Sequence, residues 1–308
     1  MSAYNAHAEG EWTQATAIRA HAEGYYTEAD GNSSHAEGQY TKAAGNYSHA
    51  EGSNNHGGEP VNDDISNSYF TRKVTSDKKI AYTFANPYIL EKYWTQYPEY
   101  KDLGETVSIT IDGSTAYNSA HAEGAGTLAF GVGSHAEGNL TLARHGRAHA
   151  EGTRTVAFNA RSHAEGHGTF AGGINSHAEG EKTEAFGLNS HSEGSQSKAI
   201  GEASHAEGGY DPDTQRGSEA KGFASHAEGS GTIAAVDQSH AEGKNTEAHG
   251  QASHAEGCDT KANGQYSHAE GHETEASGIA SHAEGYNTKA QGDYSHSSGY
   301  NTIAIDQY

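Results

Sequence analysis

Histidine and glutamate recur together along almost the whole chain, in the tetrapeptide His-Ala-Glu-Gly. An imidazole two residues from a carboxylate can exchange protons, pair as an ion or bind a metal. His-x-Glu is also half of the zinc-deaminase signature, but its Pro-Cys-x-x-Cys half is absent. Cys258 is the single cysteine, which excludes a disulfide framework and a structural zinc site built on cysteines. We expect no catalytic residue, no cofactor and no resident metal.

The histidines keep a fixed spacing. Each step within a block is 14 residues, but the step from His205 to His226 is 21 and that from His49 to His121 is 72. We interpret the chain as 17 coils of 14 residues with one short and one long insertion. The repeated residues are His7, Glu9, His21, Glu23, His35, Glu37, His49, Glu51, His121, Glu123, His135, Glu137, His149, Glu151, His163, Glu165, His177, Glu179, His191, Glu193, His205, Glu207, His226, Glu228, His240, Glu242, His254, Glu256, His268, Glu270, His282, Glu284 and His296.

The composition taken without the order of the residues is typical of disorder. Only 33% of the 308 residues are hydrophobic, and 41 acidic against 19 basic residues give a net charge of −22. This balance argues against nucleic acid and against an anionic membrane surface as partners. There is no apolar run long enough to span a membrane, and the first residues do not have the pattern of a signal peptide.

The repeat explains the composition. Residues 34–47 read Ser-His-Ala-Glu-Gly-Gln-Tyr and then Thr-Lys-Ala-Ala-Gly-Asn-Tyr, two halves of the form small-x-small-x-Gly-x-x. In a strand, alternate residues face opposite sides, so Ser34 and Ala36 face a thin core while His35 and Glu37 face outward. Glycine every seventh residue excludes a helix. We predict an all-β parallel β-roll, a solenoid whose backbone groups pair between successive coils.

The constant outward pair indicates a face that meets the same surroundings in every coil. In the second half of each coil the outward pair varies, as in Glu28 and Asp30 or Lys289 and Gln291. A roll with so thin a core gains stability by oligomerising, and a threefold axis would bring the same His and Glu residues together on every coil. The alternative is a solvated charged face. Pairing across chains predicts raised histidine and lowered glutamate pKa values, and protonated histidines that offset much of the acidic charge.

Ser-His-Ala-Glu-Gly resembles the repeat Asn-Ser-Val-Ala-Ile-Gly in the heads of trimeric autotransporter adhesins of the Yersinia YadA type. The resemblance covers about 250 residues, everything except the two insertions, with His and Glu in place of Val and Ile. It implies a left-handed parallel β-roll that forms a homotrimer. The arrays are also similar to those of tail-fibre and appendage proteins of phages and prophages of Gram-positive bacteria.

The insertions divide the chain into residues 1–52, an inserted small α+β domain at 53–116, and 117–308 with a short loop at 209–215. The domain is expected to have strands at 70–75, 79–84 and 105–111 and a short helix at 87–94. The loop contains Asp211 and Asp213, but this segment is too short to identify a calcium site. We expect the domain to dock on Leu128, Phe130, Leu142, Val156, Phe158, Phe170 and Phe186. The aromatic residues of the domain either form its own core and docking face or bind a glycan. The candidate glycan-binding residues are Tyr88, Tyr93, Trp94, Tyr97 and Tyr100.

These features predict a structural and receptor-binding module of a phage or prophage tail fibre, located on the virion tail or another extracellular surface. Its expected partners are two further copies of the chain and a glycan or protein of the host surface. One alternative is the head of a cell-surface trimeric adhesin. An alternative of another class is a tail-associated glycan-degrading enzyme, although no carboxylate pair stands out among Asp63, Asp64, Glu91, Glu99 and Asp102.

Overall fold

The computed structural model describes residues 4–53 and 119–305 in full, and between them the backbone of five strands. The chain divides into two compact units, Met1–Ala160 and Arg161–Tyr308, each described here by itself. Within the described residues no helix is long and apolar enough to cross a membrane. The five strands are β8 (Ile65–Ser66), β9 (Phe70–Val74), β10 (Ile80–Phe84), β11 (Val107–Ile111) and β12 (Ser114–Ala116).

Each unit is a parallel β-solenoid of 14-residue coils, and the two units together have about 17 turns, as the repeat predicts. Most coils have a five-residue strand that begins at the repeated histidine, followed by a two-residue strand. The first unit contains β1 (His7–Glu11), β2 (Gln14–Ala15), β3 (His21–Tyr25), β4 (Glu28–Ala29), β5 (His35–Gln39), β6 (Thr41–Ala43), β7 (His49–Ser53), β13 (His121–Ala125), β14 (Leu128–Ala129), β15 (His135–Asn139), β16 (Leu142–Ala143), β17 (His149–Thr153) and β18 (Val156–Ala157).

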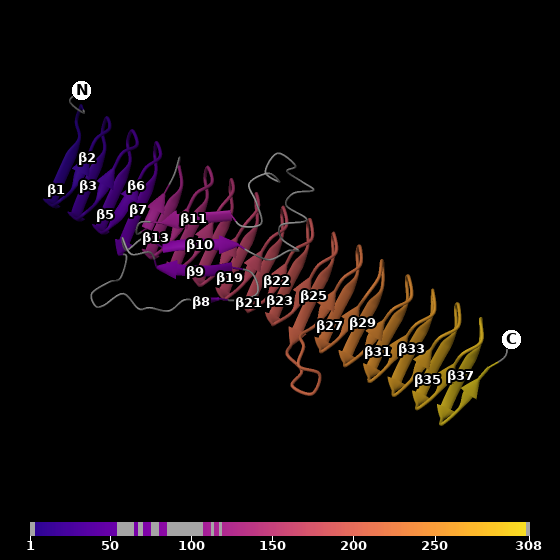
Figure 1. The fold of residues 1–308 in the computed structure, drawn as a ribbon. Coiled ribbons are helices and arrows are strands. Elements are labelled where there is room, and N and C mark those ends of the chain that lie inside the picture. Colours follow the sequence, from indigo (N-terminus) through magenta and orange to yellow (C-terminus); the bar gives the residue numbers. More distant parts are fainter. Residues whose placement is uncertain are drawn as a thin grey trace. The chain divides into compact units, whose positions relative to one another are not determined.

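The second unit repeats the same pair of strands in every coil, and its five-residue strands lie side by side in Figure 1. Its strands are β19 (His163–His167), β20 (Phe170–Ala171), β21 (His177–Glu181), β22 (Glu184–Ala185), β23 (His191–Ser195), β24 (Lys198–Ala199), β25 (His205–Gly209), β26 (Glu219–Ala220), β27 (His226–Ser230), β28 (Ile233–Ala234), β29 (His240–Lys244), β30 (Glu247–Ala248), β31 (His254–Cys258), β32 (Lys261–Ala262), β33 (His268–His272), β34 (Glu275–Ala276), β35 (His282–Tyr286), β36 (Lys289–Ala290), β37 (His296–Tyr300) and β38 (Ile303–Ala304).

The strands pair in parallel and in register, so each residue lies beside its counterpart one coil later. Between β29 and β31, His240 pairs with His254 and Ala241 with Ala255. Between β30 and β32, Glu247 pairs with Lys261. Identical positions of the repeat therefore form continuous rows along each unit.

The core is as thin as the alternation predicts. In one coil, Ser253 and Ala255 of the first half and Thr260 and Ala262 of the second are at most 1% exposed. In several coils, although not at Ser253, the serine hydroxyl donates to the carbonyl oxygen three residues earlier, as Ser281 does to Gly278 at 2.8 Å. Small side chains fill this core because the two sheets of a coil lie so close together.

The glycine in the first half of each coil is required by its backbone conformation and by close packing, in addition to the alternation of small residues. Gly257 has φ +108°, a backbone conformation that residues with a Cβ rarely adopt. A Cβ added there would lie 2.1 Å from the carbonyl oxygen of Gly271 in the following coil. The tight stacking of coils therefore leaves no room for any side chain at this position.

Both turns of each coil close through a left-handed residue, and these recur every seven residues. Examples are Ala252 (φ 52°), Asp259 (φ 56°), Tyr266 (φ 57°) and Glu273 (φ 55°). None of the four is glycine, although a left-handed conformation costs about 1–2 kcal/mol for a residue with a Cβ. Inter-coil hydrogen bonds stabilise the turns, such as that from the Glu273 amide to the Cys258 carbonyl at 2.9 Å.

Both insertions leave the solenoid at the same place, between the first and second strand of one coil. Strand β12 pairs with β6 and β14, so the solenoid resumes at Ser114, three residues before the boundary placed at 117. The short insertion lies between β25 and β26, where Asp211 and Arg216 pair across its loop. An insertion at this corner does not interrupt the rows of five-residue strands.

Strands β8 to β11 form a four-stranded antiparallel sheet. Strands β9, β10 and β11 agree with the three strands predicted in the insertion. The helix predicted at residues 87–94 lies outside the described residues.

Replacement of Gly257 by alanine should destabilise the second unit by about 3 kcal/mol, because the new Cβ clashes with backbone that has to move. Gly209→Ala is the matched control, since a Cβ there would have no atom within 4 Å. Urea denaturation followed by circular dichroism measures both, and hydrogen exchange over residues 243–285 locates the change. Equal midpoints for the two variants would contradict this explanation of the glycine row.

Candidate functional site

The repeated histidines and glutamates form a regular ladder along the five-residue strands, which we call the His–Glu ladder and define by the residues of the repeat given above. In-register pairing places each histidine beside the next, as His177 beside His191, and each glutamate beside the next, as Glu179 beside Glu193. Both side chains point away from the core, because they alternate with buried small residues. These are serine or alanine before the histidine, and alanine or, as at Ser192, serine after it.

The imidazole rings of the His–Glu ladder stack on one another. Ring centroids of adjacent coils are 4.6–4.9 Å apart in the second unit, and the ring planes differ by at most 10°. The stack is less regular at the start of the first unit, where the rings of His21 and His35 are tilted by 43°. The ring spacing equals the spacing of parallel strands, so the backbone sets it.

Within a coil, the histidine Nε2 faces the glutamate Oε2 of the same chain. The distances are 3.4–3.8 Å, for example 3.5 Å in the pair His240–Glu242 and 3.8 Å in His268–Glu270. Most are longer than a direct hydrogen bond. At the end of the second unit, Ser298 takes the place of glutamate, and His296 instead pairs with Glu284 of the preceding coil at 3.4 Å.

The ladder is half-exposed in the single chain. The side chains of His254 and Glu256 are 35% and 36% exposed. Along the ladder, a shallow hollow is lined by Glu256, Glu270 and Glu284 and by the glycines Gly271, Gly285 and Gly299. A side chain from another molecule therefore has both room and carboxylate oxygens to contact there.

The charge state of the ladder differs from the expectation for pairs across chains. Burial and the neighbouring histidines lower the pKa of His205 and His240, and the nearby glutamates do not reverse this. The pKa values of four other ladder histidines are lowered in the same way. They are His35, His177, His254 and His282. The prediction of raised pKa values concerns pairs across chains and stays a prediction, whereas in the single chain these histidines do not offset the acidic charge near pH 7.

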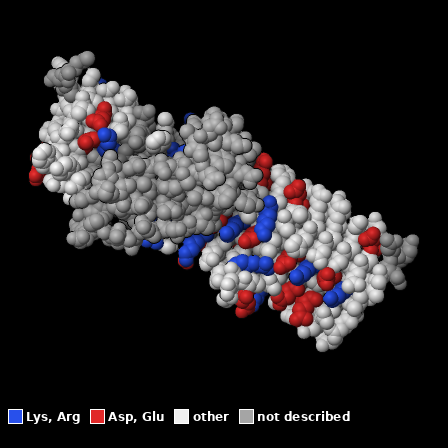
Figure 2. Space-filling view, in the orientation of Figure 1, with Lys and Arg blue, Asp and Glu red and all other residues white. Residues whose placement is uncertain are grey.

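The second strands present a more varied surface, and from β30 to β36 opposite charges alternate from coil to coil. Lys261 lies 3.5 Å from Glu247, and Lys289 lies 3.4 Å from Glu275. On the face drawn in Figure 2, acidic and basic side chains are intermixed over the second unit and form no patch of one sign. Such cross-strand pairs stabilise neighbouring strands modestly.

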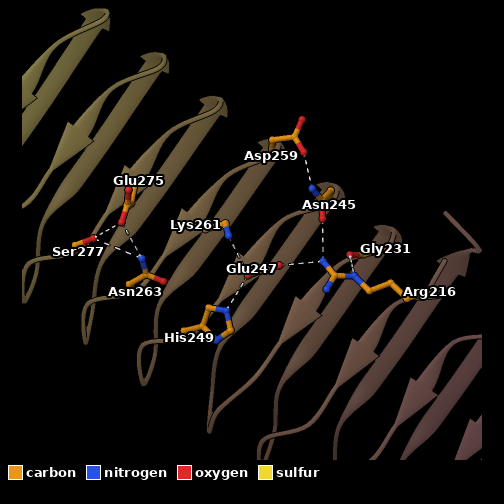
Figure 3. A network of polar contacts seen from close by, with 10 residues as sticks. All are labelled: Arg216, Gly231, Asn245, Glu247, His249, Asp259, Lys261, Asn263, Glu275 and Ser277. Carbon is orange, nitrogen blue, oxygen red and sulfur yellow. Dashed lines mark hydrogen bonds and ion pairs between the residues drawn. The ribbon is translucent and has the colours of Figure 1, made fainter. Parts of the chain in front are cut away.

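The short insertion is tied to this surface by Arg216, which periodicity does not predict (Figure 3). Its guanidinium donates to the Gly231 carbonyl at 3.0 Å, to Asn245 Oδ1 at 2.8 Å and to Glu247 Oε1 at 3.0 Å. Burial alone would raise the pKa of Glu247, but hydrogen bonds from His249 and Arg216 and the charge of Lys261 lower it to about 2. Arg216 therefore holds the loop against two later coils.

Five of the seven expected docking positions are buried. Leu128, Leu142 and Val156 are 1% exposed, whereas Phe130 is 48% exposed. Phe158 and Phe170 are also buried, and Phe186 is half-buried. The aromatic residues proposed for glycan binding, and the side chains expected to cover these positions, lie outside the described residues, so docking of the insertion stays a prediction.

Several groups of ladder residues have the composition of a metal site. Nitrogen and oxygen atoms of His226, Glu228 and His240 lie within 4.8 Å of one another, and three later sets along the ladder repeat this arrangement. A further group outside the ladder combines Cys258, Asp259 and His272.

The fold and the ladder define the chain as a parallel β-solenoid with one uniform polar face. Comparison with protein-family models and with curated proteins finds no match.

The lowered histidine pKa values predict that the ladder stabilises the fold more at neutral than at acidic pH. In the unfolded chain these histidines take up protons as pH falls through about 6.5, before the folded chain does, so stability is lost there. Glu184 acts in the opposite direction, because burial raises its pKa to about 7. In the Glu184→Gln variant, the melting temperature should therefore rise clearly from pH 5 to pH 7.5.

Wild-type protein should show a smaller rise over the same range, because ionisation of Glu184 offsets part of it. Differential scanning calorimetry at constant ionic strength measures both proteins. A melting temperature that falls with pH in Glu184→Gln would show that the ladder histidines are stabilised in their charged form.

Proposed function

We propose that the chain is the structural and receptor-binding module of a phage or prophage tail fibre, in which three copies associate through the His–Glu ladder. The observation that carries the proposal is the ladder itself, which repeats the same two side chains in register along both units. A face that served only solubility would tolerate the variation seen on the second strands, where glutamate, lysine, leucine and isoleucine alternate.

The thin core supports self-association. Most buried apolar residues of the second unit are alanines, in a row from Ala199 to Ala290. Alanine buries little apolar area, and a fold of this kind gains from burying a further face. The half-exposed ladder, with its hollow beside the glycine row, is the regular surface available for this.

The charge state of the ladder defines how the chains would pair. A neutral imidazole has one N–H group, which can donate a hydrogen bond to a carboxylate of a neighbouring chain. This bond satisfies both groups and places no positively charged histidines together at the axis. Three histidines at an axis would repel one another if they were all charged. Lowered pKa values are therefore compatible with a closed threefold ladder, although they differ from those first expected.

In this proposal the inserted domain at 53–116 carries the contact with the host surface, and the solenoid places it along the fibre. The location is the virion tail or another extracellular surface. The insertion leaves the solenoid at the corner between strands, where it does not interrupt the ladder.

Sedimentation equilibrium should give three times the chain mass of 32.3 kDa. Glu256→Lys should raise the concentration at which the trimer dissociates by at least about tenfold, because an ammonium group cannot accept the N–H that the neighbouring chain's imidazole donates. Glu202→Lys makes the same charge change at an exposed turn outside the ladder and should leave the mass unchanged. Circular dichroism checks that each variant keeps its β-structure, and a monomeric or dimeric wild type would overturn the proposal.

Receptor binding is tested on an array of bacterial surface polysaccharides. The wild-type chain should bind a subset of them, and Trp94→Ala should reduce binding by about tenfold, since it removes the apolar area that the indole buries against a sugar ring. Tyr294→Ala removes a ring that is 72% exposed on the solenoid and serves as the control. Equal loss in both variants would contradict binding through the insertion, and release of reducing ends would indicate the glycan-degrading enzyme instead.

A further inference from the structure

We propose that Cys258, Asp259 and His272 form a site for a zinc-like divalent cation on the second unit, with the carboxylate of Glu273 as the fourth ligand. The thiol, carboxylate and imidazole atoms of the first three residues all lie within 4.8 Å of one another. The site does not depend on the proposed trimer, since all its residues belong to one chain and lie outside the ladder.

The solenoid brings these residues together by register. Cys258 is the last residue of β31 and lies directly beside His272, the last residue of β33. Each is followed by an acidic residue in the left-handed conformation, Asp259 and Glu273. The Glu273 amide donates to the Cys258 carbonyl at 2.9 Å, which fixes the second pair against the first. Two consecutive coils therefore supply four ligands at one corner.

A tetrahedral site requires side-chain rotations that draw the thiol, carboxylate and imidazole atoms, now within 4.8 Å of one another, closer together and bring Glu273 in beside them. Cys258 Sγ lies 3.3 Å from Asp259 Oδ2, and His272 Nδ1 lies 3.8 Å from Glu273 Oε1. Zinc bonds of about 2.3 Å to sulfur and about 2.0–2.2 Å to nitrogen and oxygen place ligand atoms roughly 3.2–3.6 Å apart. The donor set of thiolate, imidazole and carboxylate is one that zinc accepts and that magnesium and calcium do not prefer.

The imidazole is held ready for this role. The His272 ring stacks on Tyr286 with centroids 5.0 Å apart and planes within 3°, and Tyr286 stacks on Tyr300 in turn. Its Nδ1 is buried and receives no hydrogen bond in the described part of the chain, and the nearest carboxylate is that of Glu273. Asp259 is held by Asn245, whose side-chain amide donates to its Oδ1 at 2.5 Å.

Binding would replace one interaction at the thiol. The Cys258 thiol now donates to Asp259, and a metal ion would take the thiolate as a ligand while the proton passes to solvent. Asp259 would then turn from an acceptor of that hydrogen bond into a ligand of the metal.

The test uses Co²⁺ as the probe, because a cobalt–thiolate bond has a charge-transfer band in the near ultraviolet. The reduced, metal-free full chain should bind one equivalent of Co²⁺ with this band and with strong visible bands typical of tetrahedral geometry. One equivalent of Zn²⁺ should then displace it. Cys258→Ser should abolish the charge-transfer band, and His272→Gln should weaken Co²⁺ binding by at least about tenfold.

His167→Gln is the matched control. His167 ends β19 at the same position of the repeat as His272, but no cysteine lies beside it, so its replacement should change nothing. His254→Gln removes a ladder histidine from one of the other metal-capable groups and should keep the band. Absence of the band at one equivalent of Co²⁺, or a band that His272→Gln leaves unchanged, would overturn the site.

A second measurement separates the site from a merely reactive thiol. Zn²⁺ should slow alkylation of Cys258 by iodoacetamide in the wild type by at least about tenfold and have little effect in His272→Gln. Equal protection in both proteins would show that the thiol binds the metal without the imidazole and would contradict the proposal.

Discussion

The close approach of backbone from one coil to the next is the constraint on which the rest of this structure depends. Parallel, in-register pairing places residue after residue beside its counterpart 14 positions later, as Ala241 beside Ala255. At Gly257 the carbonyl of the following coil would lie 2.1 Å from any added Cβ, so the strict glycine of the repeat follows from stacking and not from turn formation alone. The same closeness limits the core to serine, threonine and alanine.

In-register stacking also decides which charges the surface can hold. A row of identical ionised side chains would place like charges about 4.8 Å apart, which is unfavourable. On the second strands the sequence alternates glutamate and lysine, so Lys261 stands between Glu247 and Glu275. The ladder does stack glutamates in register, as Glu242 beside Glu256, but its histidines add no second row of charge there, because burial and the neighbouring imidazoles lower the pKa of His254. The excess acid of the chain is therefore real charge and is not cancelled by the ladder histidines whose pKa is lowered.

Features that follow the 14-residue repeat could be predicted from the sequence, whereas features that depart from the repeat could not. The inward Ser253 and Ala255 and the outward His254 and Glu256 follow from alternation alone, and the structure confirms them. The lowered histidine pKa values of the single chain could not be predicted from the spacing, because they depend first on burial and then on the rings above and below, which together outweigh the nearby glutamates. Arg216 was missed because its partners lie 15 to 31 residues away, distances that are no multiple of the repeat.

The sequence by itself determined the parallel β-solenoid, its 14-residue coils and the residues on each face, because a strict repeat with glycine every seventh residue permits few other folds. The tertiary structure alone decided how closely the rows pack, where each insertion leaves its coil, and which side chains meet at a corner. Cys258 and His272 are one period apart and pair in register, and the contact of the Cys258 thiol with Asp259 arises at the left-handed turn that follows. The physical reason is that periodicity specifies neighbours along a row, whereas contacts across a turn depend on the particular side chains that meet there in three dimensions.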